Sequence, residues 1–158
     1  MIILVLALLG QIQQSNAQLN IGDIAPEIKL PDTAGKWSPM SEVKSKLILL
    51  DFWAAWCYPC VQSLPDLKRI HQQYHEKGLT VYAVSLDKDY YHWIDMCRKK
   101  ELPFVLVNDA YGMNGNSCKT YNITSIPNKM LIKEGKIIGA NMSLYDLEKI
   151  IQQELKSP

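Results

Sequence analysis

One stretch of this chain decides its fold: Asp51-Phe52-Trp53-Ala54-Ala55-Trp56-Cys57-Tyr58-Pro59-Cys60. Its two thiols are separated by two residues, at the point where an apolar run ends and a helical pattern begins. This spacing allows the two thiols to close a small disulfide ring. A thiolate at the start of a helix is stabilised by the free N–H groups and the dipole of the first turn, so its pKa can fall below the ~8.5 of a free thiol. The segment is therefore typical of a site for thiol–disulfide exchange.

The two cysteines are expected to have different roles. Cys57 lies at the predicted start of the helix and is expected to be the attacking sulfur. Cys60 lies one turn further on, is expected to be more buried, and would resolve the mixed disulfide. The alternative is half of a metal site, but zinc usually needs a second pair of ligands at suitable spacing, and the sequence supplies none convincingly.

Asp51 interrupts a run of apolar residues in the predicted strand before the cysteines. A buried carboxylate is costly unless it has a task. Burial would raise the pKa of Asp51 toward the range in which it could take a proton from Cys60 and return it. The alternative is an acid at the end of a strand that reaches water.

The residues around the cysteines suggest how the site meets a substrate. Pro59 suits the first turn of a helix, where a missing N–H costs nothing, and with Tyr58 it would tune the stability of the thiolate. Trp56 is expected to shelter the reactive sulfur or to contact substrate, whereas Trp53 is expected in the core. Far downstream, Ser125-Ile126-Pro127 precedes a strand, where a cis bond would turn the backbone outward to pair with an extended substrate.

Hydrophobic periodicity predicts a mixed sheet with helices on both faces. The expected order is β-α-β-α-β-α-β-β-α, preceded by a hairpin. We expect strands at 47–53, 79–85, 104–107, 129–133 and 136–140, helices at 58–77 (with Pro65 inside), 87–100, 116–122 and 143–155, and hairpin strands at 27–30 and 36–40.

The chain of 158 residues has the length of one domain, and its charge is balanced, with 17 Lys and Arg against 16 Asp and Glu. No dense basic run is present, which argues against nucleic acid or an anionic membrane surface as a partner. The apolar run Ile2–Leu9, followed by Ser15-Asn16-Ala17, predicts a signal peptide at 1–17 and a mature domain at 18–158. No Lys or Arg precedes the apolar run, so either the given start is late or the signal is atypical. A buried N-terminal strand is the alternative that the composition allows.

Two other residue pairs resemble sites. Cys97 and Cys118 could form a structural bridge, but we favour separate buried thiols, since four cysteines allow three connectivities. His71 and His75 have a helical spacing that zinc can use. With no third ligand in view, we interpret them as part of a solvated helix face.

Several motifs resemble those of the thioredoxin family, and in particular its exported TlpA/ResA-like (redoxin) branch. The segment 51–60 is similar to the thioredoxin active-site segment, including an acid six residues before the first cysteine. Pro65 matches the proline inside the active-site helix of that family, and Ile126-Pro127 match its cis-proline loop. The redoxin branch is indicated by segments spread between about Asn20 and Lys156: Gly22-Asp23-Ile24-Ala25-Pro26, the hairpin from Leu30 to Met40, Val84-Ser85-Leu86-Asp87-Lys88-Asp89 with Trp93, and Lys133-Glu134-Gly135-Lys136-Ile137-Ile138.

This resemblance implies an α/β thioredoxin fold, with a mixed central sheet flanked by helices and an added N-terminal β-hairpin. It implies a protein-disulfide oxidoreductase of the bacterial periplasm that reduces client proteins and receives electrons from a membrane thiol reductant. Some family members serve cytochrome c maturation, and general redox homeostasis is the other expected role. We expect a monomer without metal or cofactor beyond the Cys57–Cys60 disulfide. The catalytic residues would be Cys57, Cys60 and Asp51, and the client contacts Trp56, Tyr58, Pro59, Ile126 and Pro127.

The sequence departs from the family pattern in places, and two other functions stay open. Asn128 follows the proline where a threonine is common, and several relatives carry the acid elsewhere near the site. A thiol peroxidase of the redoxin type is one alternative, but peroxiredoxin-like chains place a hydroxyl residue and a proline where this chain has Ala54 and Leu50. A non-enzymatic module that carries metal or holds an unfolded client is the other.

Overall fold

The computed structural model describes residues 19–156. The predicted signal peptide at 1–17 and the alternative N-terminal strand lie outside the described residues. Within residues 19–156, no helix is both long and apolar enough to cross a membrane.

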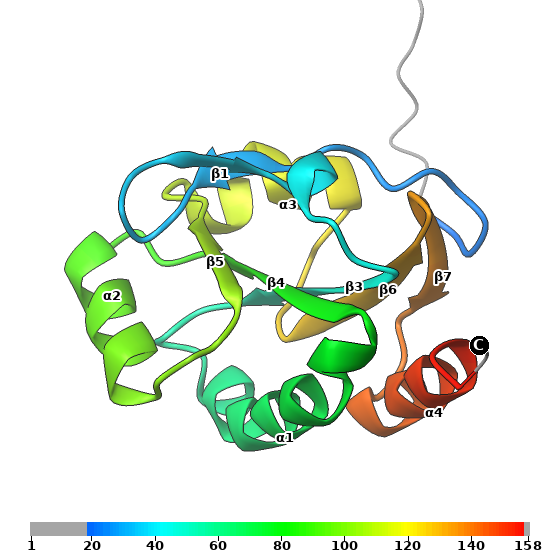
Figure 1. Ribbon diagram of the computed structural model, residues 1–158. Coiled ribbons are helices and arrows are strands. Elements are labelled where there is room, and N and C mark those ends of the chain that lie inside the picture. Colours follow the sequence, from blue (N-terminus) through cyan, green and yellow to red (C-terminus); the bar gives the residue numbers. More distant parts are fainter. Residues whose placement is uncertain (1–18, 157–158) are drawn as a thin grey trace, which may run out of the picture.

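The centre of the fold is a five-stranded mixed sheet with the strand order β5-β4-β3-β6-β7 (Figure 1). The first three strands in this order run parallel, whereas β6 pairs antiparallel with both β3 and β7. The expected strands are confirmed, three of them to the residue and the other two within one residue. Their bounds are β3 Leu47–Trp53, β4 Leu79–Ser85, β5 Val105–Asn108, β6 Asn128–Lys133 and β7 Lys136–Ala140.

Strand β3 lies in the middle of this sheet because its sequence is apolar almost throughout. Such a run can be buried on both faces only where helices or loops cover both sides. Phe52 and Trp53 at its carboxyl end are fully enclosed, which confirms Trp53 as a core residue. The strand therefore leads out of the buried core directly into residues 54–60, which contain the two cysteines.

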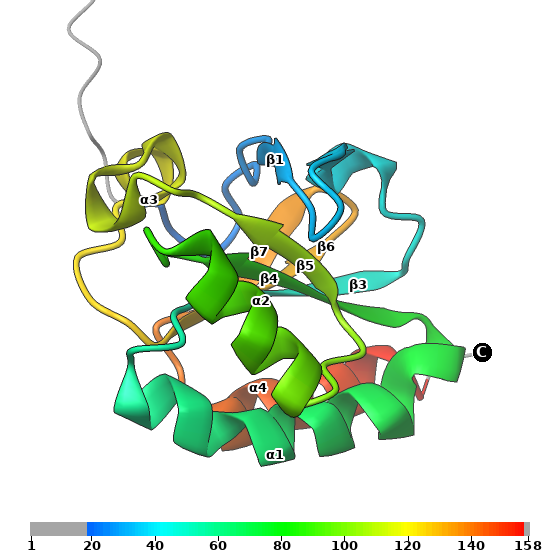
Figure 2. The same ribbon diagram turned by 90° about the vertical axis from the view of Figure 1, so that its left-hand side faces the viewer.

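Helices cover both faces of the sheet, as predicted (Figures 1 and 2). Helices α1 and α4 lie along one face, α3 lies against the opposite face, and α2 lies beside the β5 edge. The proline expected inside the first helix, Pro65, lies within α1. The helices are α1 Tyr58–Tyr74, α2 Tyr90–Lys99, α3 Asn116–Tyr121 and α4 Leu144–Glu154, with one-turn 3-10 helices at 40–42, 75–77 and 112–114.

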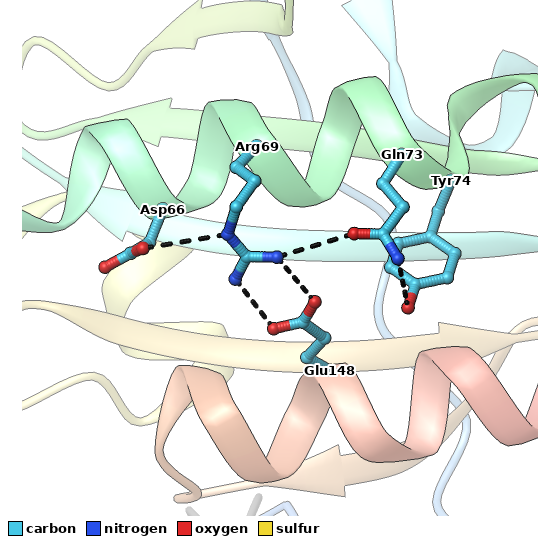
Figure 3. A network of polar contacts seen from close by, with 5 residues as sticks. All are labelled: Asp66, Arg69, Gln73, Tyr74 and Glu148. Carbon is cyan, nitrogen blue, oxygen red and sulfur yellow. Dashed lines mark hydrogen bonds and ion pairs between the residues drawn. The ribbon is translucent and has the colours of Figure 1, made fainter.

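Helices α1 and α4 are joined by a polar network on their outer side (Figure 3). Arg69 donates to both carboxylate oxygens of Glu148, at 2.7 and 2.8 Å, and this hydrogen bonding lowers the pKa of Glu148. Ion pairs near the surface contribute only about 0–1 kcal/mol. The burial of apolar side chains therefore contributes more to holding α4, and Leu147 and Ile151 of this helix are completely buried.

The expected N-terminal hairpin is present as two short antiparallel strands, β1 (Lys29–Pro31) and β2 (Trp37–Pro39). Buried tyrosine hydroxyls hold this region against the main body. The Tyr82 hydroxyl, from β4, donates to the carbonyl of Ser38 at 2.6 Å, and the Tyr121 hydroxyl, from α3, donates to that of Pro26 at 2.5 Å. Burial raises the pKa of both phenols.

The interpretation of Cys97 and Cys118 as separate buried thiols is confirmed. Neither forms a disulfide, and both lie in the hydrophobic core. Burial raises the pKa of Cys97 to about 12 and that of Cys118 to about 11. Both thiols are therefore poor nucleophiles at neutral pH.

The prediction of a solvated face for His71 is wrong. His71 is buried, and its ring packs edge-on against Phe104 at 5.5 Å between centroids. It also stacks on His75, which is exposed, at 4.6 Å. The segment before β5 covers this part of α1, a tertiary contact that helical spacing does not reveal. Burial, with a smaller contribution from His75, lowers the pKa of His71.

The buried imidazole predicts a loss of stability in acid. The unfolded chain accepts a proton on His71 near pH 6.5, whereas the folded protein resists it until lower pH, so the free energy of unfolding falls as pH drops through this range. We expect His71→Phe, which keeps an aromatic ring beside Phe104, to lose less stability than the parent between pH 7.5 and 5.5. Urea unfolding at both pH values measures this.

The exposed residue His92 supplies the matched control, since His92→Gln should keep the parental decline. A His71→Phe variant that declines as steeply as the parent would contradict the assignment.

Candidate active site

The two cysteines of the redox segment lie at the junction between β3 and α1 and form a disulfide, with an S–S distance of 2.11 Å. Strand β3 ends at Trp53, and α1 begins at Tyr58 with Cys57 as its N-cap. The Cys60 N–H donates to Cys57 Sγ at 3.3 Å, so the helix terminus is aimed at the first sulfur. This geometry favours a thiolate at Cys57 in the reduced protein.

The disulfide lies just beneath a surface of exposed aromatic side chains. Cys57 is 5% exposed and Cys60 is 1% exposed, which agrees with the expected order of access. Trp56 and Tyr58 on either side of Cys57 are 57% and 74% exposed, and Pro59 is exposed as well. A partner chain that reached Cys57 would meet these side chains first.

Asp51 is buried in the middle of the sheet, so the alternative of an acid reaching water is wrong. It lies opposite Lys129 in the antiparallel register of β3 and β6, and Lys129 Nζ is 3.0 Å from Asp51 Oδ1. Burial raises the pKa of Asp51, and the charge of Lys129 opposes part of that rise. The carboxyl group is thus shifted in the direction that proton transfer near neutral pH requires.

Lys129 is a residue that sequence reasoning missed. It was expected only as the first residue of a strand, although it precedes an apolar run just as Asp51 interrupts one. Two opposite charges in two buried strands were the available signal, but only the strand register shows that they face each other. Asp87 was also missed, and its carboxylate accepts a hydrogen bond from the Ala55 N–H in the loop before Cys57.

The downstream proline loop lies at the same end of the central strands as the disulfide. Asn128, the first residue of β6, pairs with Phe52, so Ile126 and Pro127 fall beside the segment that leaves β3. The Ile126–Pro127 peptide bond is cis, as the resemblance implied. Ile126 is half-buried and Pro127 exposed, so both residues contribute to the rim.

No cluster of three or more His, Cys, Asp or Glu side chains suited to a metal ion occurs within residues 19–156. His71 and His75 stack with their rings roughly parallel, at 30° between planes. The Nδ1 atom of His75 lies 3.3 Å from the carbonyl oxygen of Leu79.

Comparison with known proteins gives consistent matches over most of the chain. The model of the AhpC/TSA family matches residues 21–141. The thiol-disulfide oxidoreductase ResA of Bacillus thuringiensis subsp. konkukian is 30% identical over 122 residues, which are 77% of this chain and 69% of that protein. The thioredoxin-like protein YneN of Bacillus subtilis is 32% identical over 120 residues, which are 74% of this chain and 68% of that protein.

A solved structure shows the same fold. The thioredoxin domain of a thiol-disulfide oxidoreductase from Bacteroides vulgatus superposes with a TM-score of 0.80 at 26% identity, covering 87% of this chain and 99% of that one.

The buried ion pair predicts a specific pH dependence for the oxidised protein. The raised pKa of Asp51 means that the folded state holds this proton to higher pH than the unfolded chain does. Ionisation of Asp51 therefore lowers the free energy of unfolding as pH rises from about 4 through its folded pKa. Lys129→Met removes the opposing charge and should extend this loss to higher pH. At pH 8 we expect a cost on the order of 3 kcal/mol, the usual result of breaking a buried pair.

Urea unfolding between pH 5 and 8.5 measures the effect, and the double variant Asp51→Asn/Lys129→Met is its control, because it lacks the titrating acid. The double variant should show no such added slope. A Lys129→Met protein with the parental slope would show that the two side chains do not interact.

Proposed function

The chain belongs to the AhpC/TSA family, as a TlpA/ResA-like thiol-disulfide oxidoreductase with a thioredoxin fold, and we propose that it reduces disulfides of client proteins outside the cytoplasm. The observation that carries the proposal is the Cys57–Cys60 disulfide at the N-terminus of α1. A closed ring of two cysteines at that place can open and reform while the strand and helix around it stay folded.

The proposed reaction is two thiol–disulfide exchanges. In the reduced protein, the Cys57 thiolate attacks one sulfur of a client disulfide. The client S–S bond breaks, and a mixed disulfide forms between Cys57 and the client. Cys60, as a thiolate, then attacks the Cys57 sulfur, which closes the Cys57–Cys60 bond and releases the second client thiolate. The client gains two electrons and, in water, two protons, and this protein is oxidised by the same amount.

Asp51 is proposed to take the proton of Cys60 in the second exchange. A buried thiol loses its proton only if an acceptor is near. The burial of Asp51 and the upward shift of its pKa suit it to hold a proton and to return it later. Lys129 limits that shift, so the acid can still ionise.

The exposed rim of the site is proposed to bind the client chain. It consists of side chains beside the disulfide and of the proline loop at the same end of the central strands: Trp56, Tyr58, Pro59, Ile126 and Pro127. Large aromatic side chains supply contact area to many sequences, which fits a reductase with more than one client.

The location, the electron donor and the biological role are further parts of the proposal. The predicted signal peptide at 1–17 supports export, with the domain 18–158 acting in the periplasm as a monomer. A membrane thiol reductant would return two electrons to the Cys57–Cys60 disulfide, and no other cofactor would be needed. The clients would include the disulfide of apocytochromes, which is reduced to two thiols during cytochrome c maturation, or disulfides of exported proteins in general.

The first test is the reduction of insulin by dithiothreitol with the purified protein. The parent should accelerate the reaction, and Cys57→Ser should reduce the rate to that of dithiothreitol alone, because the attacking sulfur is gone. Cys118→Ala is the matched control, since it removes a buried thiol that takes no part in the disulfide and should keep the parental rate. Undiminished activity of Cys57→Ser would contradict the proposal.

Two measurements on the same preparation fix the reaction class and the direction. A reduction potential of roughly −270 mV would support a reductase, whereas one of roughly −120 mV would make the protein an oxidant. The reduced protein should not consume hydrogen peroxide, since Ala54 offers no hydroxyl where peroxiredoxin-like chains place one. Rapid peroxide turnover would favour a thiol peroxidase instead.

The second test traps the client. Cys60→Ser in the full chain cannot resolve the mixed disulfide, so adducts through Cys57 should accumulate in the extracytoplasmic fraction, on a chain that begins at Gln18. The double variant Cys57→Ser/Cys60→Ser should form none. Adducts with apocytochrome c would support a role in its maturation, and adducts confined to the cytoplasm would overturn the proposed location.

A further inference from the structure

We propose that Asp87 is a positioning residue for the redox site, which fixes the loop between Trp53 and Cys57 so that Cys57 stays at the N-terminus of α1. The proposal deepens the proposed function, because the loop is held for thiol exchange. Asp87 itself touches neither sulfur in any contact of the described residues, and it acts through the backbone of Ala55.

The link between Asp87 and the loop is a direct hydrogen bond. The Ala55 N–H, two residues before Cys57, donates to Asp87 Oδ2 at 2.9 Å. Both residues are buried, so this N–H has no access to water as a substitute. A buried N–H without an acceptor is strongly unfavourable, and the loop would have to move to satisfy it.

This hydrogen bond extends the β3–β4 ladder past the last residues whose backbones pair with each other. The strands pair through Trp53 and Ser85, and the Leu86 N–H still donates to the Trp53 carbonyl at 2.8 Å. After Trp53 the chain turns away toward the helix. The Asp87 side chain reaches across that divergence and supplies the next acceptor.

Asp87 is in turn held by polar side chains at the ends of β4 and β5. The Ser85 hydroxyl donates to Asp87 Oδ2 at 2.8 Å and accepts from the Asp87 N–H at 3.0 Å. The Asn108 amide donates to Ser85 Oγ at 3.1 Å and to the Asp87 carbonyl at 2.9 Å. The network therefore ties the carboxyl ends of three parallel strands to the loop that carries Cys57.

A buried carboxylate at position 87 costs free energy of folding unless its hydrogen bonds have a function. Asp87 forms no ion pair within residues 19–156, and its Oδ1 is buried without a hydrogen-bond donor in the same part of the chain. A buried, unpaired carboxylate is kept only where something depends on it. The contact that depends on it here is the one to Ala55.

The test is the pH dependence of Cys57 alkylation, measured in a reduced Cys60→Ser background in which Cys97 and Cys118 stay buried. In Asp87→Ala the loop loses its acceptor, so the midpoint of alkylation should move up toward that of a free thiol. Asp87→Ala in the parent, with Cys60 present, should lower the rate of insulin reduction at least about tenfold, as expected when a reacting group is misplaced. Asp87→Asn keeps an acceptor oxygen and should restore most of both properties.

Two further variants complete the test. Ser85→Ala keeps Asp87 but removes the hydroxyl that orients it, and should move the midpoint in the same direction by a smaller amount, which keeps the proposal testable if Asp87→Ala does not fold. Asp109→Asn alters another buried acid, one that accepts from Ser117 and not from the loop, and should leave the midpoint unchanged.

Parental midpoints in folded Asp87→Ala and Ser85→Ala, or an equal shift in Asp109→Asn, would overturn the proposal. Because alkylation needs no client, this result is independent of whether the parent reduces insulin, so a failure of the proposed function would be recognised separately.

Discussion

The chemistry of this protein depends on where β3 stops. The strand is buried on both faces and cannot turn until it leaves the sheet after Trp53. Cys57 then caps α1, and the free N–H groups of the first turn lie next to its sulfur. Cys60 follows one turn later, close enough to close the disulfide and more enclosed than Cys57. The different roles proposed for two chemically identical side chains therefore arise from their position relative to one helix terminus.

The features that depend on neighbouring residues in the sequence were predictable. Strands β3 and β4 were placed to the residue, because a strand buried on both faces is a continuous apolar run bounded by polar or turn residues. Gly78 adopts a left-handed conformation at the end of the first helical segment, and Ser143 caps α4, as their residue types indicate. The helix expected at 87–100 begins later, because Asp89 is the cap and accepts from the N–H groups of the first turn.

Features that depend on strand register or on packing between distant segments were not predictable. Asp51 was visible as a polar residue in an apolar strand, but its partner Lys129 lies on another strand, and only the β3–β6 register brings the two charges together. His71 was misassigned for the same reason, since the residue that covers it, Phe104, precedes a different strand. Asp87 was noticed only as part of a motif, and its contact with Ala55 crosses from one strand end to the next.

The two buried acids near the site have surroundings that suit them to different tasks. Asp51 faces a cation, and a change in its protonation alters an ion pair inside the sheet. Asp87 faces a backbone N–H and a hydroxyl, and its oxygen is part of the geometry that places Cys57. A reductase needs both a group that exchanges a proton and a site that keeps its shape while it does so. If the proposed function holds, separating these tasks between two acids allows the proton to move without displacing the sulfur that the client must reach.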